Sequence, residues 1–134
     1  MPGSFFDTNT LIYLLSSDVA KVSRVEELLK GGGTISVQVL NELTNVMRRK
    51  LKMKWPAVDM FLANLRETLD VVPLTVEVHA KGLMISRRYG FSIYDSMILA
   101  TAVISQCTVV WSEDMQDGFE VAPGLNICNP FSRA

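Results

Sequence analysis

Four carboxylate residues stand next to apolar segments, where a charge is costly to bury unless it is paired. Asp7 directly follows Phe5 and Phe6, and Asp95 is followed by the apolar run SMILATAVI. Glu42 lies on a segment with helical apolar spacing, and Asp114 lies shortly after the apolar run TVVW. These four residues are the ones whose type and surroundings point to chemistry.

A divalent cation is the natural partner for such carboxylates if they converge. Carboxylates close together cannot all stay ionised without a counter-charge, and no Lys or Arg is adjacent to any of the four in the sequence. Sites made only of oxygen ligands select hard ions. The pattern therefore predicts a Mg²⁺ or Mn²⁺ site held by Asp7, Glu42, Asp95 and Asp114.

Each acid also has a simpler structural explanation. Asp7 is a favoured N-cap for a helix that starts at Thr8. The stretch SIYD matches a capping box, in which Asp95 reaches back to Ser92. The remaining acids are compatible with surface-helix or turn positions: Glu42, Asp114 and Asp117. Only convergence in space separates these explanations from a metal site.

Short apolar segments alternate with segments of helical periodicity along the chain. Strands are expected at 4–6, 34–36, 71–74, 108–111 and 125–129. Helices are expected at 8–16, from a cap at Ser17 or Asp18 to the glycines at 31–33, and at 37–52, 55–69, 75–90 and 92–106. The alternation predicts one α/β domain over 1–134 with a mostly parallel sheet. Because such sheets bind ligands beyond the carboxyl ends of their strands, Asp7 and Asp114 are expected to meet at one edge.

Composition sets the broad class of protein. The chain has 134 residues, 49% hydrophobic and 20% charged, which suits a folded domain with one core. No apolar run reaches the roughly 18 residues that a membrane helix needs. Cys107 and Cys128 are expected to be reduced thiols in a cytosolic protein.

The basic residues are clustered although the net charge is only −1. One run comprises Arg48, Arg49, Lys50, Lys52 and Lys54, and a second is the pair Arg87–Arg88. A solvated helix end explains such runs, since cations suit the helix dipole. The alternative is a patch that contacts RNA or a partner, with Arg48, Arg49, Lys50, Arg87 and Arg88 as the contacts.

Other chemistries fit the sequence poorly. His79 is the single histidine, which disfavours a Ser-His-Asp triad, and with two cysteines it cannot complete a structural zinc site. The glycines at 31–33 are not followed by the GK[ST] of a phosphate-binding loop. A haloacid-dehalogenase-like phosphatase with Asp7 as nucleophile would carry D-x-D, but position 9 is Asn.

Four short motifs in order, FFDTN, NEL, YDS and VVWSEDMQDG, resemble the PIN-domain nucleases, and the closing NPF is similar as well. The likeness is greatest to the VapC-like toxins of toxin–antitoxin pairs and extends over the whole chain. It implies a three-layer PIN-like domain whose acidic quartet holds Mg²⁺ or Mn²⁺: Asp7, Glu42, Asp95 and Asp114, with Asp117 as an additional acid. Thr8, Asn9 and Ser112 are implied to order that site. Which of Glu113, Asp114 and Asp117 faces the metal stays open.

The resemblance also implies a function and partners. It predicts a cytoplasmic metal-dependent endoribonuclease that cuts single-stranded or structured RNA, forms homodimers and is held inactive by an antitoxin. The alternative is a catalytically silent PIN-like scaffold that binds RNA or protein. An antitoxin would cover exposed apolar residues, and the candidates are Tyr13, Leu14, Trp55, Phe61 and Leu62. The alternative is that these residues pack in the core.

Overall fold

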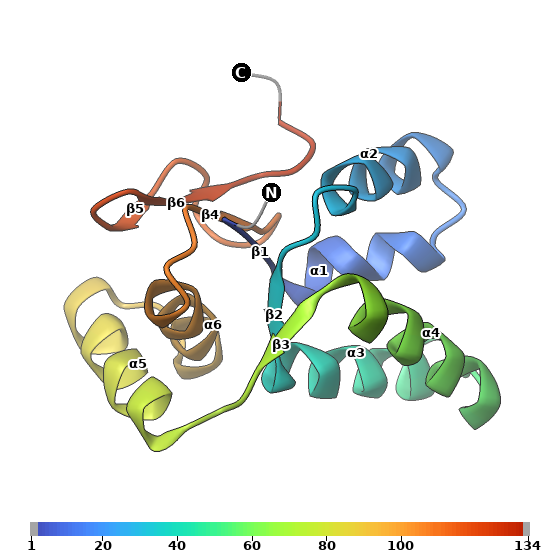
Figure 1. The fold of residues 1–134 in the computed structure, drawn as a ribbon, viewed down its shortest axis with the longest axis horizontal. Helices are drawn as coiled ribbons and strands as arrows, with labels where there is room; N and C mark the ends of the chain where they lie inside the picture. The colour runs from blue at the N-terminus through green and yellow to red at the C-terminus, as the bar shows by residue number, and fades with distance from the viewer. Residues whose placement is uncertain (1–2, 133–134) are drawn as a thin grey trace.

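A six-stranded sheet in the order β3-β2-β1-β4-β6-β5 runs through the molecule (Figure 1). Its strands are β1 (Ser4–Phe6), β2 (Thr34–Ser36), β3 (Asp70–Val72), β4 (Val109–Trp111), β5 (Glu120–Ala122) and β6 (Leu125–Cys128). All neighbouring pairs are parallel except β5 with β6. The structure is a computed structural model that describes residues 3–132, so both ends of the domain predicted over 1–134 lie outside it.

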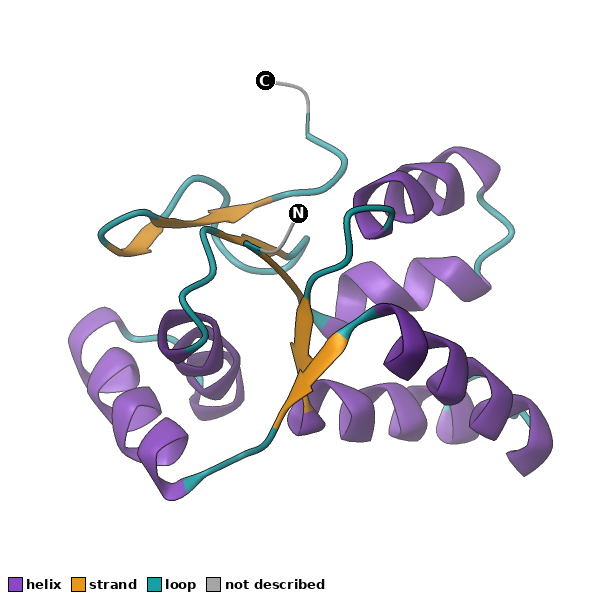
Figure 2. Cartoon of the chain, viewed as in Figure 1, coloured by secondary structure: helices purple, strands orange, loops and turns teal. Residues whose placement is uncertain are grey.

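Helices cover both faces of the sheet. They are α1 (Thr8–Leu11), the 3₁₀ turn η1 (Ile12–Leu15), α2 (Val19–Leu29), α3 (Val37–Arg49), α4 (Trp55–Thr68), α5 (Val76–Tyr89) and α6 (Ile93–Ile104). Figures 1 and 2 show α5 and α6 on one side of the sheet and α1 to α4 on the other. The predicted three-layer α/β architecture with a mostly parallel sheet is confirmed.

Strand β1 and helix α6 form the centre of the core. Phe5 and Phe6 point to opposite faces of β1 and both are fully buried, as expected for a strand covered on two sides. Helix α6 is buried along Ser96–Ala102, in keeping with the apolar run SMILATAVI that it contains. Packing of these elements fixes the positions from which the acids project.

Two helices begin where a serine caps them. Ser36 ends β2, and its hydroxyl accepts a hydrogen bond from the backbone N–H of Val39, so the strand passes directly into α3. Ser92 caps α6 by accepting from the N–H of Asp95. These caps set the helical register of Glu42 and Asp95 without an intervening flexible loop.

Several element boundaries differ from those expected. The helix predicted at 8–16 is divided into α1 and η1. Helix α3 ends at Arg49 and not at 52, and Lys52 has a left-handed backbone with φ of 54°. Strand β3 ends before Pro73, which lacks the N–H that a sheet ladder uses. β3 lies at the edge of the sheet, the position where a neighbouring proline is best tolerated.

Strand β5 was missed because its sequence signal is only three residues long. Glu120–Ala122 pairs with β6 through a turn that contains Pro123 and Gly124, and Gly124 has φ of 83°. A Pro-Gly pair between two apolar stretches marks a turn. This pair was the signal in the sequence from which β5 could have been predicted.

Among residues 3–132, no helix combines the length and the apolar character needed to cross a membrane. Cys107 and Cys128 are both free thiols.

Gly33, just before β2, lies so close to β1 that a side chain there would clash. Its φ is +145°, and a Cβ there would lie 2.7 Å from Phe6 Cε2 and 2.9 Å from the carbonyl oxygen of Ser4. Gly33→Ala should lower the free energy of unfolding by about 2–5 kcal/mol, through backbone strain plus overpacking. Gly124→Ala, at positive φ with open space around it, should cost only about 1–2 kcal/mol. Urea denaturation measures both, and equal losses would contradict the steric explanation.

Candidate active site

The four predicted acids line one cleft of ≈ 640 Å³. Asp7 follows β1, Glu42 lies on α3, Asp95 lies in the first turn of α6, and Asp114 follows β4. Because β1, β2 and β4 are parallel neighbours, the segments that follow them leave the sheet at the same edge. The convergence expected from the strand pattern is therefore present.

Asp7 is buried and receives three hydrogen bonds. Its Oδ1 accepts from the N–H of Thr8 at 2.7 Å, and its Oδ2 accepts from Ser112 Oγ at 2.8 Å and from Asn9 Nδ2 at 3.0 Å. Only 4% of the residue is exposed. Asp7 thus both caps α1 and lines the cleft, so its role as a helix cap and its place among the converging acids are compatible.

Burial raises the pKa of Asp7 to about 6. Hydrogen bonds from Ser112 and Thr8 oppose this rise, while the negative charges of Asp95 and Glu42 add to it. Folding therefore makes ionisation of Asp7 less favourable than in the unfolded chain.

Glu42 is held by two donors. Thr8 Oγ1 donates to Glu42 Oε1 at 2.5 Å, and Gln38 Nε2 donates to Oε2 at 3.3 Å. Gln38 also donates to the backbone carbonyl of Tyr94 at 2.9 Å, which ties α3 to the start of α6. The sequence reasoning missed Gln38; its signal was the i, i+4 spacing to Glu42 on one helix face.

Asp95 combines a cap contact with a place in the cleft. Burial raises its pKa, a hydrogen bond with Ser92 lowers it, and the charges of Glu42 and Asp114 raise it further. The electrostatic coupling of Asp95 to Glu42, Asp114 and Asp7 makes the four carboxylates one charged cluster.

The three acids after β4 face different surroundings. Asp114 is exposed and lines the cleft. Asp117 accepts from the backbone N–H of Asn129 at 2.8 Å and from Ser132 Oγ at 3.5 Å, and it does not line the cleft. Glu113 does not line the cleft either. The geometry therefore favours Asp114 at the fourth corner.

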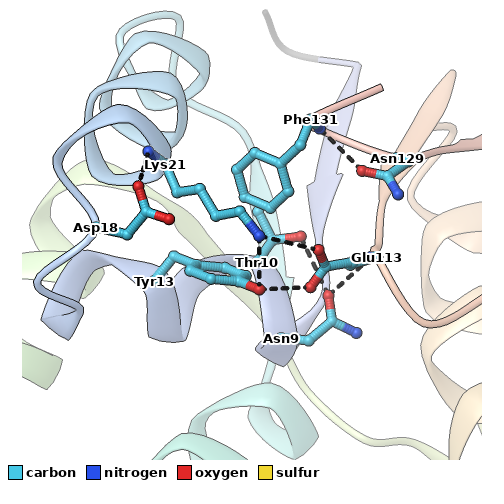
Figure 3. A network of polar contacts seen from close by, with 8 residues as sticks. All are labelled: Asn9, Thr10, Tyr13, Asp18, Lys21, Glu113, Asn129 and Phe131. Carbon is cyan, nitrogen blue, oxygen red and sulfur yellow. Dashed lines mark hydrogen bonds and ion pairs between the residues drawn. The ribbon is translucent and has the colours of Figure 1, made fainter. Parts of the chain in front are cut away.

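Glu113 belongs to a separate polar network beside the cleft (Figure 3). Its carboxylate accepts from Tyr13 Oη at 2.7 Å and lies 3.5 Å from Lys21 Nζ, which stands over the rings of Tyr13 and Phe131 at 4.6 and 4.8 Å. Its backbone N–H donates to Asn9 Oδ1 at 3.0 Å. The network fastens the loop that carries Asp114 to α1, η1 and α2.

The donor atoms of the cleft suit a hard cation. The side chains that line it offer carboxylate, hydroxyl and amide oxygens, and neither His nor Cys is among them. Four carboxylates face one lysine, Lys50, so negative charge is in excess. Within residues 3–132, no three acidic, histidine or cysteine side chains already form a metal cage. The oxygen donors present are of the kind that Mg²⁺ and Mn²⁺ prefer.

The predicted RNA contacts separate into different places. Lys50 lines the acidic cleft. The Arg48 guanidinium stacks over the Trp55 ring at 4.3 Å, at the junction of α3 and α4. Arg49 is exposed, and Arg87–Arg88 line another pocket at the end of α5. The structure brings only Lys50 to the four acids.

The predicted partner-facing apolar residues also divide. Leu14, Phe61 and Leu62 are half-buried and pack against the core. Tyr13 is engaged in the polar network, and Trp55 is 53% exposed. Core packing accounts for three of the five.

Comparison with known proteins identifies the family. The model of the PIN domain matches residues 4–123, and the chain therefore belongs to the PIN-domain family, as its motifs indicated. No curated protein sequence matches the chain.

Solved structures show the same fold. A toxin–antitoxin complex from Klebsiella pneumoniae has a TM-score of 0.75 at 19% identity and covers 97% of this chain and 99% of its own. A sarcin–ricin-loop-cleaving VapC toxin from Mycobacterium tuberculosis has a TM-score of 0.68 at 18% identity, covering 83% and 91%. DNA-bound VapBC from Salmonella typhimurium has a TM-score of 0.68 at 22% identity, covering 97% and 99%.

The raised pKa of Asp7 predicts an unusual pH dependence of stability. Between pH 4 and 6 the folded protein holds a proton on Asp7 that the unfolded chain, with its ordinary value near 3.8, has lost. Stability in EDTA should therefore fall as pH rises through this window, by about 3 kcal/mol from Asp7 alone. Asp7→Asn removes this dependence.

Urea denaturation of wild type and Asp7→Asn from pH 3.5 to 7 measures the effect. Subtracting the two curves cancels the other titrating groups, so the wild type should lose stability relative to the variant as pH rises. A difference that does not change with pH would contradict the burial of an ionisable Asp7.

Proposed function

We propose that the chain is a Mg²⁺- or Mn²⁺-dependent endoribonuclease that acts as the toxin of a type II toxin–antitoxin pair. The observation that carries the proposal is the meeting of Asp7, Glu42, Asp95 and Asp114 in one cleft of a PIN domain. Like charges that meet in one cleft without paired cations are costly, most of all for the buried Asp7, so a bound cation best explains their convergence.

The protein's part in the reaction is to hold and orient. A divalent ion, when bound, would supply polarisation of the scissile phosphate and acidification of water. Asp7, Asp95 and Asp114 would hold it through their carboxylate oxygens. Glu42 completes the set, and its donors, Thr8 and Gln38, aim its carboxylate.

Two further side chains order Asp7. Ser112 Oγ and Asn9 Nδ2 both donate to Asp7 Oδ2, which fixes the orientation of the carboxylate, and the bond from Ser112 partly opposes the rise in its pKa that burial causes. Lys50 at the cleft supplies a positive charge for a substrate phosphate. Such a contact positions RNA without reading its sequence.

Other functions explain the site less well. A silent PIN-like scaffold has no use for four acids that destabilise one another. A haloacid-dehalogenase-like phosphatase needs a second acid at position 9, but the amide of Asn9 is bonded to Asp7 and Ser112. Both alternatives leave the cluster without a role.

The partners of this chain are proposed from the assemblies in which similar folds occur. Similar folds occur in a toxin–antitoxin complex from Klebsiella pneumoniae and in VapBC from Salmonella typhimurium. We expect a cognate antitoxin and a homodimer for this chain, in the cytoplasm, where its free thiols stay reduced.

Cleavage of a labelled panel of single-stranded RNAs and tRNAs tests the proposed activity. Wild type should cut in Mg²⁺ or Mn²⁺ and not in EDTA. Asp95→Asn and Asp7→Asn should fold and lose cleavage by at least about a hundredfold, because each removes a charged oxygen from the ion. Circular dichroism verifies the fold of each variant. Full metal-dependent activity in Asp7→Asn would refute the site.

A second test compares two neighbouring acids. Asp114→Asn should weaken Mn²⁺ binding by about tenfold or more, since it removes a charge-assisted contact. Asp117→Asn should change Mn²⁺ binding less than about twofold, because Asp117 holds Asn129 outside the cleft. Isothermal titration calorimetry measures both, and a larger loss in Asp117→Asn would reverse the assignment.

A further inference from the structure

The acidic cleft continues along helix α3 into a second hollow. This hollow, ≈ 390 Å³, is lined by Gln38, Asn41, Glu42, Asn45, Leu74 and Tyr94. It shares Glu42 and Asn45 with the acidic cleft. The two hollows are therefore adjacent along α3, and together they are named the α3 groove.

One face of α3 forms the floor of this groove. Gln38, Asn41, Glu42 and Asn45 have the i, i+3, i+4, i+7 spacing that aligns side chains on one side of a helix. Lys50 follows towards the end of α3 and lines the acidic part. The floor therefore runs from amide groups, past Glu42, to a cation.

Tyr94 and Leu74 stand at the end of the groove away from Lys50. Tyr94 is 69% exposed, although its backbone carbonyl is held by Gln38 and the next residue, Asp95, lines the acidic cleft. Leu74 is 42% exposed beside it. An aromatic ring on a fixed backbone thus presents an accessible surface close to the acids.

The polar groups of the groove are available for a ligand. Within residues 3–132, the side-chain amides of Asn41 and Asn45 make no hydrogen bond, and Lys50 makes no ion pair. Amides both donate and accept. An exposed ring can stack on a base, free amides can bond the edge of that base, and a free cation can contact a phosphate. Together these groups suit a nucleotide bound beside the acid cluster.

We propose that the α3 groove binds one unpaired nucleotide next to the scissile phosphate. Its base stacks on Tyr94, its edge meets Asn41 and Asn45, and a neighbouring phosphate contacts Lys50. This inference rests on the proposed nuclease function and restricts the substrate class to RNA with an unstacked base. A duplex keeps its bases stacked and cannot offer one to Tyr94.

Anisotropy of a fluorescein-labelled, ten-nucleotide unpaired RNA tests the groove. The Asp95→Asn background in Mn²⁺ keeps the RNA intact. Adding Tyr94→Ala should weaken binding about five- to a hundredfold, the range for one lost base–aromatic stack. Tyr94→Phe keeps the ring and should bind within about twofold of its parent.

Lys50 is tested by salt dependence. Lys50→Ala should reduce the slope of log affinity against log salt by about 0.7, the value for one phosphate contact of a single strand. Arg49→Ala is the matched control, because Arg49 is adjacent and exposed but lines neither hollow. Equal slope changes in the two variants would overturn the role of Lys50.

Two outcomes would overturn the base site. One is unchanged binding in Tyr94→Ala, and the other is loss of binding that size-exclusion chromatography traces to a lost dimer, which would assign Tyr94 to a second copy. If wild type cuts RNA but Tyr94→Ala binds normally, the proposed base site is refuted and the proposed nuclease activity is kept. If wild type cuts no RNA but Tyr94→Ala loses binding while it stays folded and dimeric, the proposed nuclease activity is refuted and the base site is kept.

Discussion

Burial of Asp7 beside other carboxylates at one edge of the sheet is the constraint on which this structure depends. Burial raises the pKa of Asp7 to about 6, and the charges of Asp95 and Glu42 add to that rise. Among residues 3–132, none of the four acids forms an ion pair, so the raised pKa of Asp7 lowers stability at neutral pH. The cation proposed for this site would relieve that cost.

The scaffold opposes the repulsion among these carboxylates with rigid attachments. Ser36 and Ser92 cap α3 and α6, so Glu42 and Asp95 project from the starts of well-packed helices. The N–H of Asp7 and the hydroxyl of Thr10 both donate to the carbonyl of Trp111, which locks the end of β1 to the end of β4. Groups that repel one another are therefore held in place by the backbone.

Structural and chemical roles coincide in the same residues. Asp7 caps α1 with one oxygen while its carboxylate lines the cleft, and Asp95 donates its backbone N–H to the α6 cap Ser92 while it lines the same cleft. Glu113 and Asp117, in contrast, hold Tyr13 and the turn at Asn129. Neighbouring acids thus serve different purposes because the loop after β4 turns each towards different partners.

The sequence by itself determined the fold class, the order of most elements and the identity of the four converging acids. Apolar periodicity and strand ends carry that information locally, and parallel strands bring their carboxyl ends to one edge. It did not determine β5, whose three residues give too short a pattern, or the break between α1 and η1. The choice among Glu113, Asp114 and Asp117, the link from Gln38 to Tyr94, and the separation of Lys50 from Arg48 were decided by tertiary structure. Each depends on which distant side chain lies within hydrogen-bonding or stacking reach, and spacing along the chain does not contain that information.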